Sequence, residues 1–340
     1  SIKACGTLFN TVMDIDPTVA MYIAAFIIVA YTFLGGFSAV CWTDFFQGMI
    51  MLAALLIAPL FALALAKAGD GAATGAALPD GFFNFFTTPQ DIISGLGWGL
   101  GYFGMPHIII RFMSLKSEKE LRKSSVIGIS WTTIILIMSA LTAIAGRLYL
   151  GEIEDSSTVF ITMVRRIFPA LVSGLLLSAI LSAAMSTADS QLLAASSAFA
   201  SDVYKPVIRK KASDSEMLWA GRIVVIVIAI VALFIASDPN SGSIMGLVEN
   251  AWGVFGASFG PVILLSLFWK RLTFGGTVAG IAVGAAVDIL WLVFLSSTDI
   301  YEIVPGFAAG LLAAVVVSLL SKGPGKDVED LFDRAVDLKS

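Results

Sequence analysis

The sequence has 340 residues, of which 58% are hydrophobic and only 14% are charged, with a formal net charge of −4 and a mean hydropathy of +0.91. Soluble domains carry about 25% charged residues, so this composition excludes a soluble globular protein and indicates a multi-spanning membrane protein. We see no basic surface that would favour nucleic acid as a partner.

Long stretches without Asp, Glu, Lys or Arg predict the membrane-spanning helices. A helix needs about 20 apolar residues to cross the hydrocarbon core. Seven uncharged stretches approach that length, and two more qualify if Arg222 lies at one end of its span and Asp288 lies inside another. We therefore expect an all-α, polytopic membrane protein with nine transmembrane helices, at residues 17–43, 45–66, 92–110, 124–146, 167–188, 223–237, 250–269, 272–298 and 303–321.

The basic residues predict how the chain is oriented. If the first span runs from outside to inside, the inner segments hold 16 of the 21 Lys and Arg residues, as the positive-inside rule requires. We expect a multi-pass protein of the cell's inner (plasma) membrane, with residues 1–322 as a single transmembrane domain and residues 323–340 as a flexible cytoplasmic tail. Cys5 and Cys41 then lie on opposite sides of the membrane, so no disulfide between them is expected.

The connection between the first two spans carries a candidate acid. Gly35 and Gly36 favour an end to the first span, and the residues that follow are expected to form a short inner turn. Asp44 would then open the second span. Capping of the free backbone N–H groups at the start of that helix is one explanation for this residue, and a functional role is the other.

The third span is expected to be broken. Its sequence, SGLGWGLGYFGMPH, has five glycines and then Pro106, a composition too weak in helix propensity for one regular rod. Broken membrane helices mark binding sites in transporters, and Trp98 and Tyr102, spaced i,i+4, would stack on the apolar part of a ligand. The alternative is close helix packing through the glycines with two ordinary aromatic residues. His107, the only histidine, is expected to be structural.

The fifth span and the residues after it contain a face of small and hydroxyl side chains. Steps of three and four residues place them along one side of a helix. Such a face lets a neighbouring helix approach closely, and its oxygens also suit a hard cation, so both explanations stay open here. Asp189 lies deep in the same segment, where an acid needs a partner or a function. The face consists of Ala179, Ala183, Ser186, Thr187, Ser190, Ala194, Ser197 and Ser201.

The eighth span combines glycines with an acid. Its small residues are expected to pack closely against a neighbouring helix, and Asp288 is expected to be structural or paired with a loop rather than to couple transport. The glycines are Gly275, Gly276, Gly280 and Gly284.

Motifs of enzymes and channels are absent from the sequence. It contains no G-x-S-x-G, H-E-x-x-H or Walker motif and no paired Cys or His ligands. It also has neither the repeated filter sequence nor the ring of like charges that indicates a channel. The pattern favours a secondary carrier, which draws its energy from an ion or substrate gradient.

Five segments, in order over essentially the whole chain, carry a family resemblance. They are GGFSAVCWTD, GWGLGYFGMPHIIIRFM, LLLSAILSAAMSTADSQLLAASSAFASDVYK, GLVENAWGVFGASFGPVILLSLFWKR and YEIVPGF. The sequence resembles the sodium/solute symporter family, and within it the bacterial sodium/proline symporters. This implies two inverted five-helix repeats, of which the chain would hold the last two helices of the first, all five of the second and two peripheral helices. The first core helix would lie upstream of Ser1, so the chain alone is not expected to transport.

The resemblance also implies the binding residues. The main sodium site would use one backbone carbonyl and two hydroxyls, from Ala183, Ser186 and Thr187. A second sodium ion, which some members bind, would use Asp44, Asp189 and Ser190. The substrate would lie against Trp98, Tyr102 and Pro106. Met105 departs from the pattern, because a proline symporter is expected to have Gln there.

The implied function is sodium-coupled import of a small organic solute by alternating access, with L-proline as the first candidate and sodium as the coupling ion. Two alternatives stay open: a different solute, such as pantothenate or another carboxylate, and a non-transporting membrane sensor. The short segment after Leu320 argues against the sensor, because it leaves no room for a signalling domain.

Overall fold

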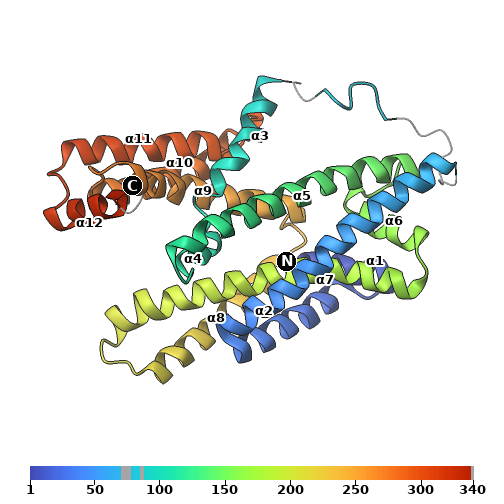
Figure 1. The fold of residues 1–340 in the computed structure, drawn as a ribbon, viewed down its shortest axis with the longest axis horizontal. Coiled ribbons are helices and arrows are strands. Elements are labelled where there is room, and N and C mark those ends of the chain that lie inside the picture. Colours follow the sequence, from blue (N-terminus) through green and yellow to red (C-terminus); the bar gives the residue numbers. More distant parts are fainter. Residues whose placement is uncertain (70–77, 85–87, 338–340) are drawn as a thin grey trace. The chain divides into compact units, whose positions relative to one another are not determined.

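The computed structural model describes residues 1–69, 78–84 and 88–337, and every regular element within these ranges is a helix (Figure 1). Eight helical segments there are long and apolar enough to cross a membrane. They are Pro17–Gly36, Ser38–Ala68, Lys119–Leu150, Ala170–Ile208, Asp214–Ser237, Ile244–Phe268, Phe274–Phe294 and Ile303–Leu320. The predicted all-α, polytopic membrane fold is confirmed, and the broken third span accounts for the remaining predicted segment.

The chain forms two compact units, one of Ser1–Phe82 with Leu115–Ile244 and one of Phe83–Ser114 with Met245–Ser340. The helices of the first unit are α1 (Ile2–Met13), α2 (Pro17–Ala68), α5 (Glu118–Leu150), η1 (Ser156–Thr158), α6 (Val159–Ile167), α7 (Ala170–Ala198), η2 (Phe199–Ile208) and α8 (Asp214–Ser237). The helices of the second unit are α3 (Pro89–Gly101), α4 (Pro106–Met113), α9 (Ile244–Phe268), α10 (Phe274–Phe294), η3 (Ser296–Thr298), α11 (Ile303–Leu320) and α12 (Lys326–Asp337).

In the first unit, α2 packs along α7 and α5. Ala54, Ala58 and Ala62, four residues apart on one face of α2, are fully buried. They belong to the same apolar cluster as Met163 and Val164 of the short helix α6. Alanine at these positions lets helix backbones approach closely, which is how membrane helices gain packing energy in the absence of a hydrophobic effect.

A single glycine, rather than a turn, separates the first two spans. The predicted inner turn after Gly35 is wrong: only Gly36 leaves helical geometry, with φ 64° and ψ −172°, and helical structure resumes at once. This backbone conformation is essentially restricted to glycine, so one residue suffices to redirect the chain. Asp44 consequently lies inside the second span, and the alternative in which it caps a helix is also wrong.

In the second unit, the predicted break of the third span is confirmed. Thr88 and Asp91 form a capping box at the start of α3. The helix ends at Gly101, and α4 begins at Pro106, where a proline is tolerated because the first helical N–H has no intrahelical partner. Neither piece is long enough to cross a membrane as a helix.

The predicted glycine interface of the eighth span is a seam between α10 and α11, which lie side by side (Figure 1). A Cβ on Gly280 would lie 3.1 Å from the carbonyl oxygen of Gly310, and one on Gly276 would overlap the hydroxyl of Ser318. Gly275 is less tightly placed, because its nearest neighbour would be 3.7 Å away. Glycine at the tight positions allows the two backbones to touch.

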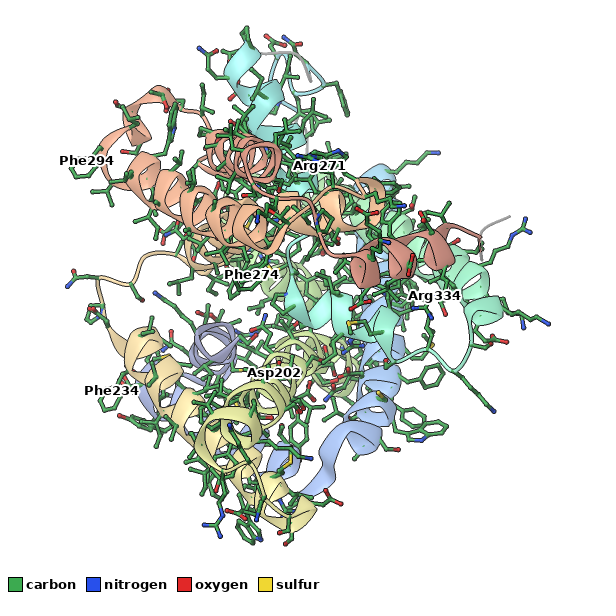
Figure 2. The ribbon with its side chains drawn as sticks, turned by 90° about the vertical axis from the view of Figure 1, so that its left-hand side faces the viewer. Asp202, Phe234, Arg271, Phe274, Phe294 and Arg334 are labelled. Atoms are coloured by element: carbon green, nitrogen blue, oxygen red, sulfur yellow. The ribbon has the colours of Figure 1, made fainter. Side chains whose placement is uncertain are left out.

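Large apolar side chains cover the outside of the helices. Phe234 of α8 and Phe294 of α10 project away from their ribbons (Figure 2) and are 73% and 72% exposed. Contiguous apolar exposure of this kind is rare in soluble proteins, and here it provides the surface that faces lipid.

The flexible tail expected at residues 323–340 is instead largely helical, because residues 326–337 form α12. Lys270 Nζ lies 2.6 Å from Asp333 Oδ2 and fixes α12 to the link between α9 and α10. The hydrogen bond that Lys270 donates to the Asp333 carboxylate raises the pKa of Lys270. Both side chains are exposed, so this ion pair positions the tail more than it stabilises the fold.

Candidate functional site

The residues predicted for the main sodium site share one carbonyl oxygen on α7. Ser186 Oγ donates to the carbonyl oxygen of Ala183 at 3.2 Å, and Thr187 Oγ1 donates to the same oxygen at 2.9 Å. Ser186 is half-buried and Thr187 is exposed within this unit. Each hydroxyl keeps its lone pairs while it donates, so the two oxygens can still coordinate a cation.

The residues predicted for the second sodium site come together from α2 and α7. Ser190 Oγ lies 3.2 Å from Asp44 Oδ2 and 3.3 Å from Asp189 Oδ1, and it lies 2.7 Å from the carbonyl oxygen of Ser186. Asp189 is fully buried. A hydroxyl has one hydrogen, so Ser190 can donate to only one of these three oxygens at a time. The arrangement concentrates acceptor oxygens in the way that a hard cation requires.

Tyr31 is a member of this cluster that sequence reasoning missed. Its hydroxyl donates to Asp189 Oδ2 at 2.7 Å and lies 3.2 Å from the carbonyl oxygen of Met185. It therefore supplies the partner that an acid at this depth needs. The signal in the sequence is weak, because a tyrosine in an apolar span is equally typical of the membrane interface.

The hydroxyl face predicted for the fifth span is only partly buried. Ala179 and Ser190 are buried, whereas Thr187 and Ser197 are exposed. Ser201 lies beyond α7 in η2, a π-helical segment, where the wider turns change the side-chain register. The face is thus concentrated between Ala179 and Ser190.

In the second unit, two of the three predicted substrate residues, Trp98 and Tyr102, lie against an aromatic residue of α9. The ring centroids of Trp98 and Trp252 are 6.2 Å apart, and those of Tyr102 and Trp252 are 4.9 Å apart with the rings nearly perpendicular. Trp252 Nε1 also donates to the carbonyl oxygen of Trp98 at 3.0 Å. Tyr301 also contacts Trp98, and the centroids of these two rings are 5.4 Å apart. Burial raises the pKa of Tyr301, which keeps its hydroxyl a neutral donor to the carbonyl oxygen of Glu249.

Tyr102 and Pro106, by contrast, are exposed within this unit, and Met105 between them is buried.

Sequence reasoning missed Trp252 and Tyr301, because nothing local in the sequence pairs them with residues about 150 or more positions earlier. Their membership in the cluster follows from the packing of α3 on α11 and from the contacts of α9.

The glycines of the break serve two purposes. A Cβ on Gly101 would overlap the indole of Trp252, and one on Gly104 would overlap the backbone of Phe255, so these positions allow close packing. Gly95 and Gly99 face open space. Close packing therefore explains Gly101 and Gly104, whereas Gly95 and Gly99 have no packing neighbour that requires glycine.

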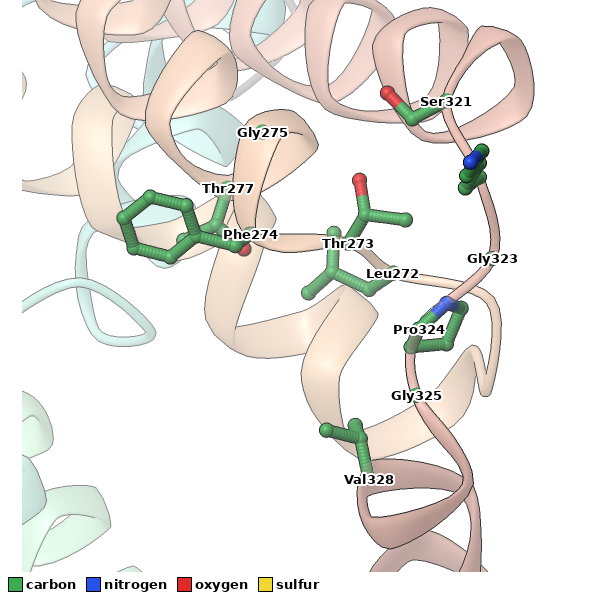
Figure 3. A pocket seen from close by; sticks show the side chains of 11 residues that line it. Leu272, Thr273, Phe274, Gly275, Thr277, Ser321, Gly323, Pro324, Gly325 and Val328 are labelled. Carbon is green, nitrogen blue, oxygen red and sulfur yellow. The ribbon is translucent and has the colours of Figure 1, made fainter.

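A hollow of about 630 Å³ lies at the start of α10 and along the link between α11 and α12 (Figure 3). Thr273, Phe274, Ser321 and Pro324 are among the residues that line it. It contains none of the residues predicted to bind sodium or substrate, and we assign it no part in transport.

Residues 1–284 match the model of the Sodium:solute symporter family. The chain belongs to this family. Family membership places it among multi-pass membrane transporters rather than enzymes, as its sequence predicts.

Several relatives that resemble this family member over nearly its whole length are proline transporters by name. It is 44% identical to the high-affinity proline transporter PutP of Bacillus subtilis (strain 168) over 98% of this chain and 72% of that protein. It is 42% identical to the sodium/proline symporter of Haemophilus influenzae over 98% of this chain and 70% of that protein.

A solved structure shares the fold. A Na⁺-coupled sialic acid symporter in a substrate-bound, outward-open state matches 95% of this chain and 71% of its own length, with a TM-score of 0.75 and 21% sequence identity. At this identity the likeness speaks for the arrangement of helices and not for the solute.

Proposed function

We propose that this chain supplies the ion and solute sites of a sodium-coupled symporter that imports L-proline by alternating access. The observation that carries the proposal is the 44% identity to a high-affinity proline transporter over 98% of the chain. Relatives in Haemophilus influenzae and Staphylococcus saprophyticus are named sodium/proline symporters, which supports sodium as the coupling ion.

The sodium ions would bind to oxygens of α7. For the main ion, the ligands from this chain are the carbonyl of Ala183 and the hydroxyls of Ser186 and Thr187. For a second ion, they are the carboxylates of Asp44 and Asp189 and the hydroxyl of Ser190. What supports the second set is its convergence across two helices, with Ser190 Oγ within 3.3 Å of both acids.

Proline would bind at the break between α3 and α4. Trp98 and Tyr102 offer aromatic surface to the apolar pyrrolidine ring, and Pro106 fixes the end of the break. The backbone between the two helices provides polar groups for the charged ends of an amino acid, as in other transporters with broken helices.

In the membrane, residues 1–322 would form the transmembrane domain and residues 323–340 a cytoplasmic tail. The excess of Lys and Arg in the segments on one side of the spans supports this orientation.

Radiolabelled proline uptake tests the proposal. Cells that express the gene encoding this chain should accumulate proline in sodium buffer and lose most of that uptake in potassium buffer. Unlabelled pantothenate and other carboxylates should not compete. Equal uptake in the two buffers would exclude sodium coupling, and competition by pantothenate but not by unlabelled proline would assign a different solute.

The main sodium site is tested by Thr187→Ala. Removal of one ligand oxygen should raise the half-saturating sodium concentration by about tenfold, which corresponds to about 1.4 kcal/mol. Ser178→Ala is the matched control, because Ser178 lies on the same helix and its hydroxyl likewise donates to a backbone carbonyl, that of Leu175 at 2.6 Å. An unchanged sodium dependence in Thr187→Ala, or an equal change in the control, would count against the site.

A further inference from the structure

Two buried carboxylates of the second unit have no part in the transport proposed above. Asp288 of α10 is fully buried, and Glu302, the residue before α11, is 7% exposed. Both face Gly253 of α9, since a Cβ on this glycine would lie 3.0 Å from Asp288 Oδ1 and 3.3 Å from Glu302 Oε1. Helix α10 and the start of α11 thus direct two acidic groups toward one small space beside α9.

Three of the four oxygens of these carboxylates lack hydrogen-bond partners within the described part of the chain. Both oxygens of Asp288 and Oε1 of Glu302 are buried without a hydrogen bond. Neither residue forms an ion pair there, so the prediction that Asp288 pairs with a loop is wrong. A buried carboxylate without a partner is strongly unfavourable, so protons or a group outside the polypeptide must neutralise it.

A shared proton does not meet this need. A carboxyl group that donates to a carboxylate requires the two oxygens to lie about 2.5–3.0 Å apart, and no hydrogen bond joins Asp288 to Glu302. One shared proton would also leave the second oxygen of Asp288 unsatisfied. A hard cation, by contrast, accepts several carboxylate oxygens at once, at about 2.3–2.6 Å each for an ion of calcium size.

The charge around the pair favours a divalent ion. Two carboxylates balance two positive charges, whereas a monovalent ion would leave one negative charge buried. The nearest further charged group on α9 is another acid, Glu249, whose carbonyl oxygen accepts a hydrogen bond from Tyr301. It adds negative charge at the same end of these helices.

We propose that Asp288 and Glu302 bind one divalent hard cation of calcium size in the space beside Gly253. Backbone carbonyls and water complete the coordination shell, as they do in other calcium sites. The ion links α9, α10 and the start of α11, so its binding stabilises the second unit. This site is separate from the sodium ligands of α7 and does not depend on the solute that is carried.

Thermal unfolding with calcium tests the site. The chain is purified in detergent micelles, stripped with EGTA and titrated with CaCl₂, while the intrinsic fluorescence of tryptophan is followed; Trp252 is adjacent to Gly253. A saturating ion that binds only the folded state should raise the midpoint by about 3 °C or more. Asp288→Asn and Glu302→Gln should abolish that shift and leave the calcium-free midpoint equal or higher, because each removes an unpartnered buried charge.

Asp299→Asn is the matched control. Asp299 is an exposed acid three residues before Glu302, and its left-handed backbone, with φ 54°, suits asparagine. It should keep the full calcium response. Gly253→Ala retains both carboxylates but places a methyl group between them, so it should lose the response as well; this variant keeps the test decisive if a carboxylate variant does not fold.

Three results would overturn the proposal. The first is a wild-type midpoint that calcium does not change. The second is an equal calcium shift in wild type and in the double variant Asp288→Asn/Glu302→Gln. The third is an equal shift produced by KCl at the same ionic strength, because that would indicate general screening.

Discussion

At the scale of single residues, the hydrogen bond between Tyr31 and Asp189 is the contact that the sequence did not reveal. The depth of Asp189 in an apolar span indicates that it needs a partner, but that partner lies 158 positions earlier along the chain. Patterns of three and four residues identify which side chains share a helix face. They carry no information on which helix lies opposite, so Tyr31 could not be found from them.

Tyr31→Phe should destabilise the chain through Asp189. Loss of the donor leaves a buried carboxylate oxygen without its 2.7 Å hydrogen bond, which should lower the free energy of unfolding by about 1–2 kcal/mol. Thermal unfolding in detergent measures this loss. Tyr22→Phe is the control, since Tyr22 lies in the same span and is 54% exposed. If Tyr31→Phe retains its loss when Asp189 is also replaced by Ala, which removes the acceptor oxygens, the hydrogen bond is not its cause.

At the scale of elements, glycine and proline explain both what could be predicted and what could not. The break between α3 and α4 follows from local composition, because five glycines and Pro106 cannot sustain one regular helix. The prediction of a turn after Gly35 was wrong for a related reason. Two adjacent glycines do not show which of them leaves the helix or how many residues follow it, and the structure needs only Gly36.

Gly101 and Gly99 give a matched test of the break. Gly101→Ala would force a methyl group into the indole of Trp252, and overpacking of this kind costs about 1–3 kcal/mol. Gly99→Ala meets nothing within 4 Å and should be neutral or stabilising by up to about 1 kcal/mol, because alanine is the better helix former. The midpoint of thermal unfolding should fall in Gly101→Ala and stay equal or rise in Gly99→Ala. Equal midpoints in the two variants would show that α3 does not pack on Trp252 as described.

At the scale of the whole molecule, hydropathy predicted the class of protein and the segments that could span a membrane. Eight predicted spans appear as continuous helices in the described residues, and the ninth is the α3–α4 pair. The division into two units could not be predicted. Phe83–Ser114 belongs with Met245–Ser340, and such a pairing depends on long-range contacts rather than on local composition.

A fusion at the carboxyl terminus tests the orientation. Green fluorescent protein folds only on the cytoplasmic side, whereas alkaline phosphatase becomes active only outside, so the first fusion should fluoresce and the second should be inactive. The physical reason is the excess of Lys and Arg in the segments assigned to the inner side. The reverse result would invert every loop assignment, and a fusion to the link between α5 and α6 should give the opposite signals as an internal control.

The single non-helical residue within α2, Gly36, has a mechanical consequence. Tyr31 holds α7 from one side of Gly36, through Asp189, and Asp44 holds it from the other side, through Ser190. Gly36 is the hinge between two helical segments, and each contact fixes one of these segments to α7. The angle between the two segments can change only if one of these hydrogen bonds breaks. Any ligand that binds Asp189 and Ser190 therefore also acts on the bend of α2.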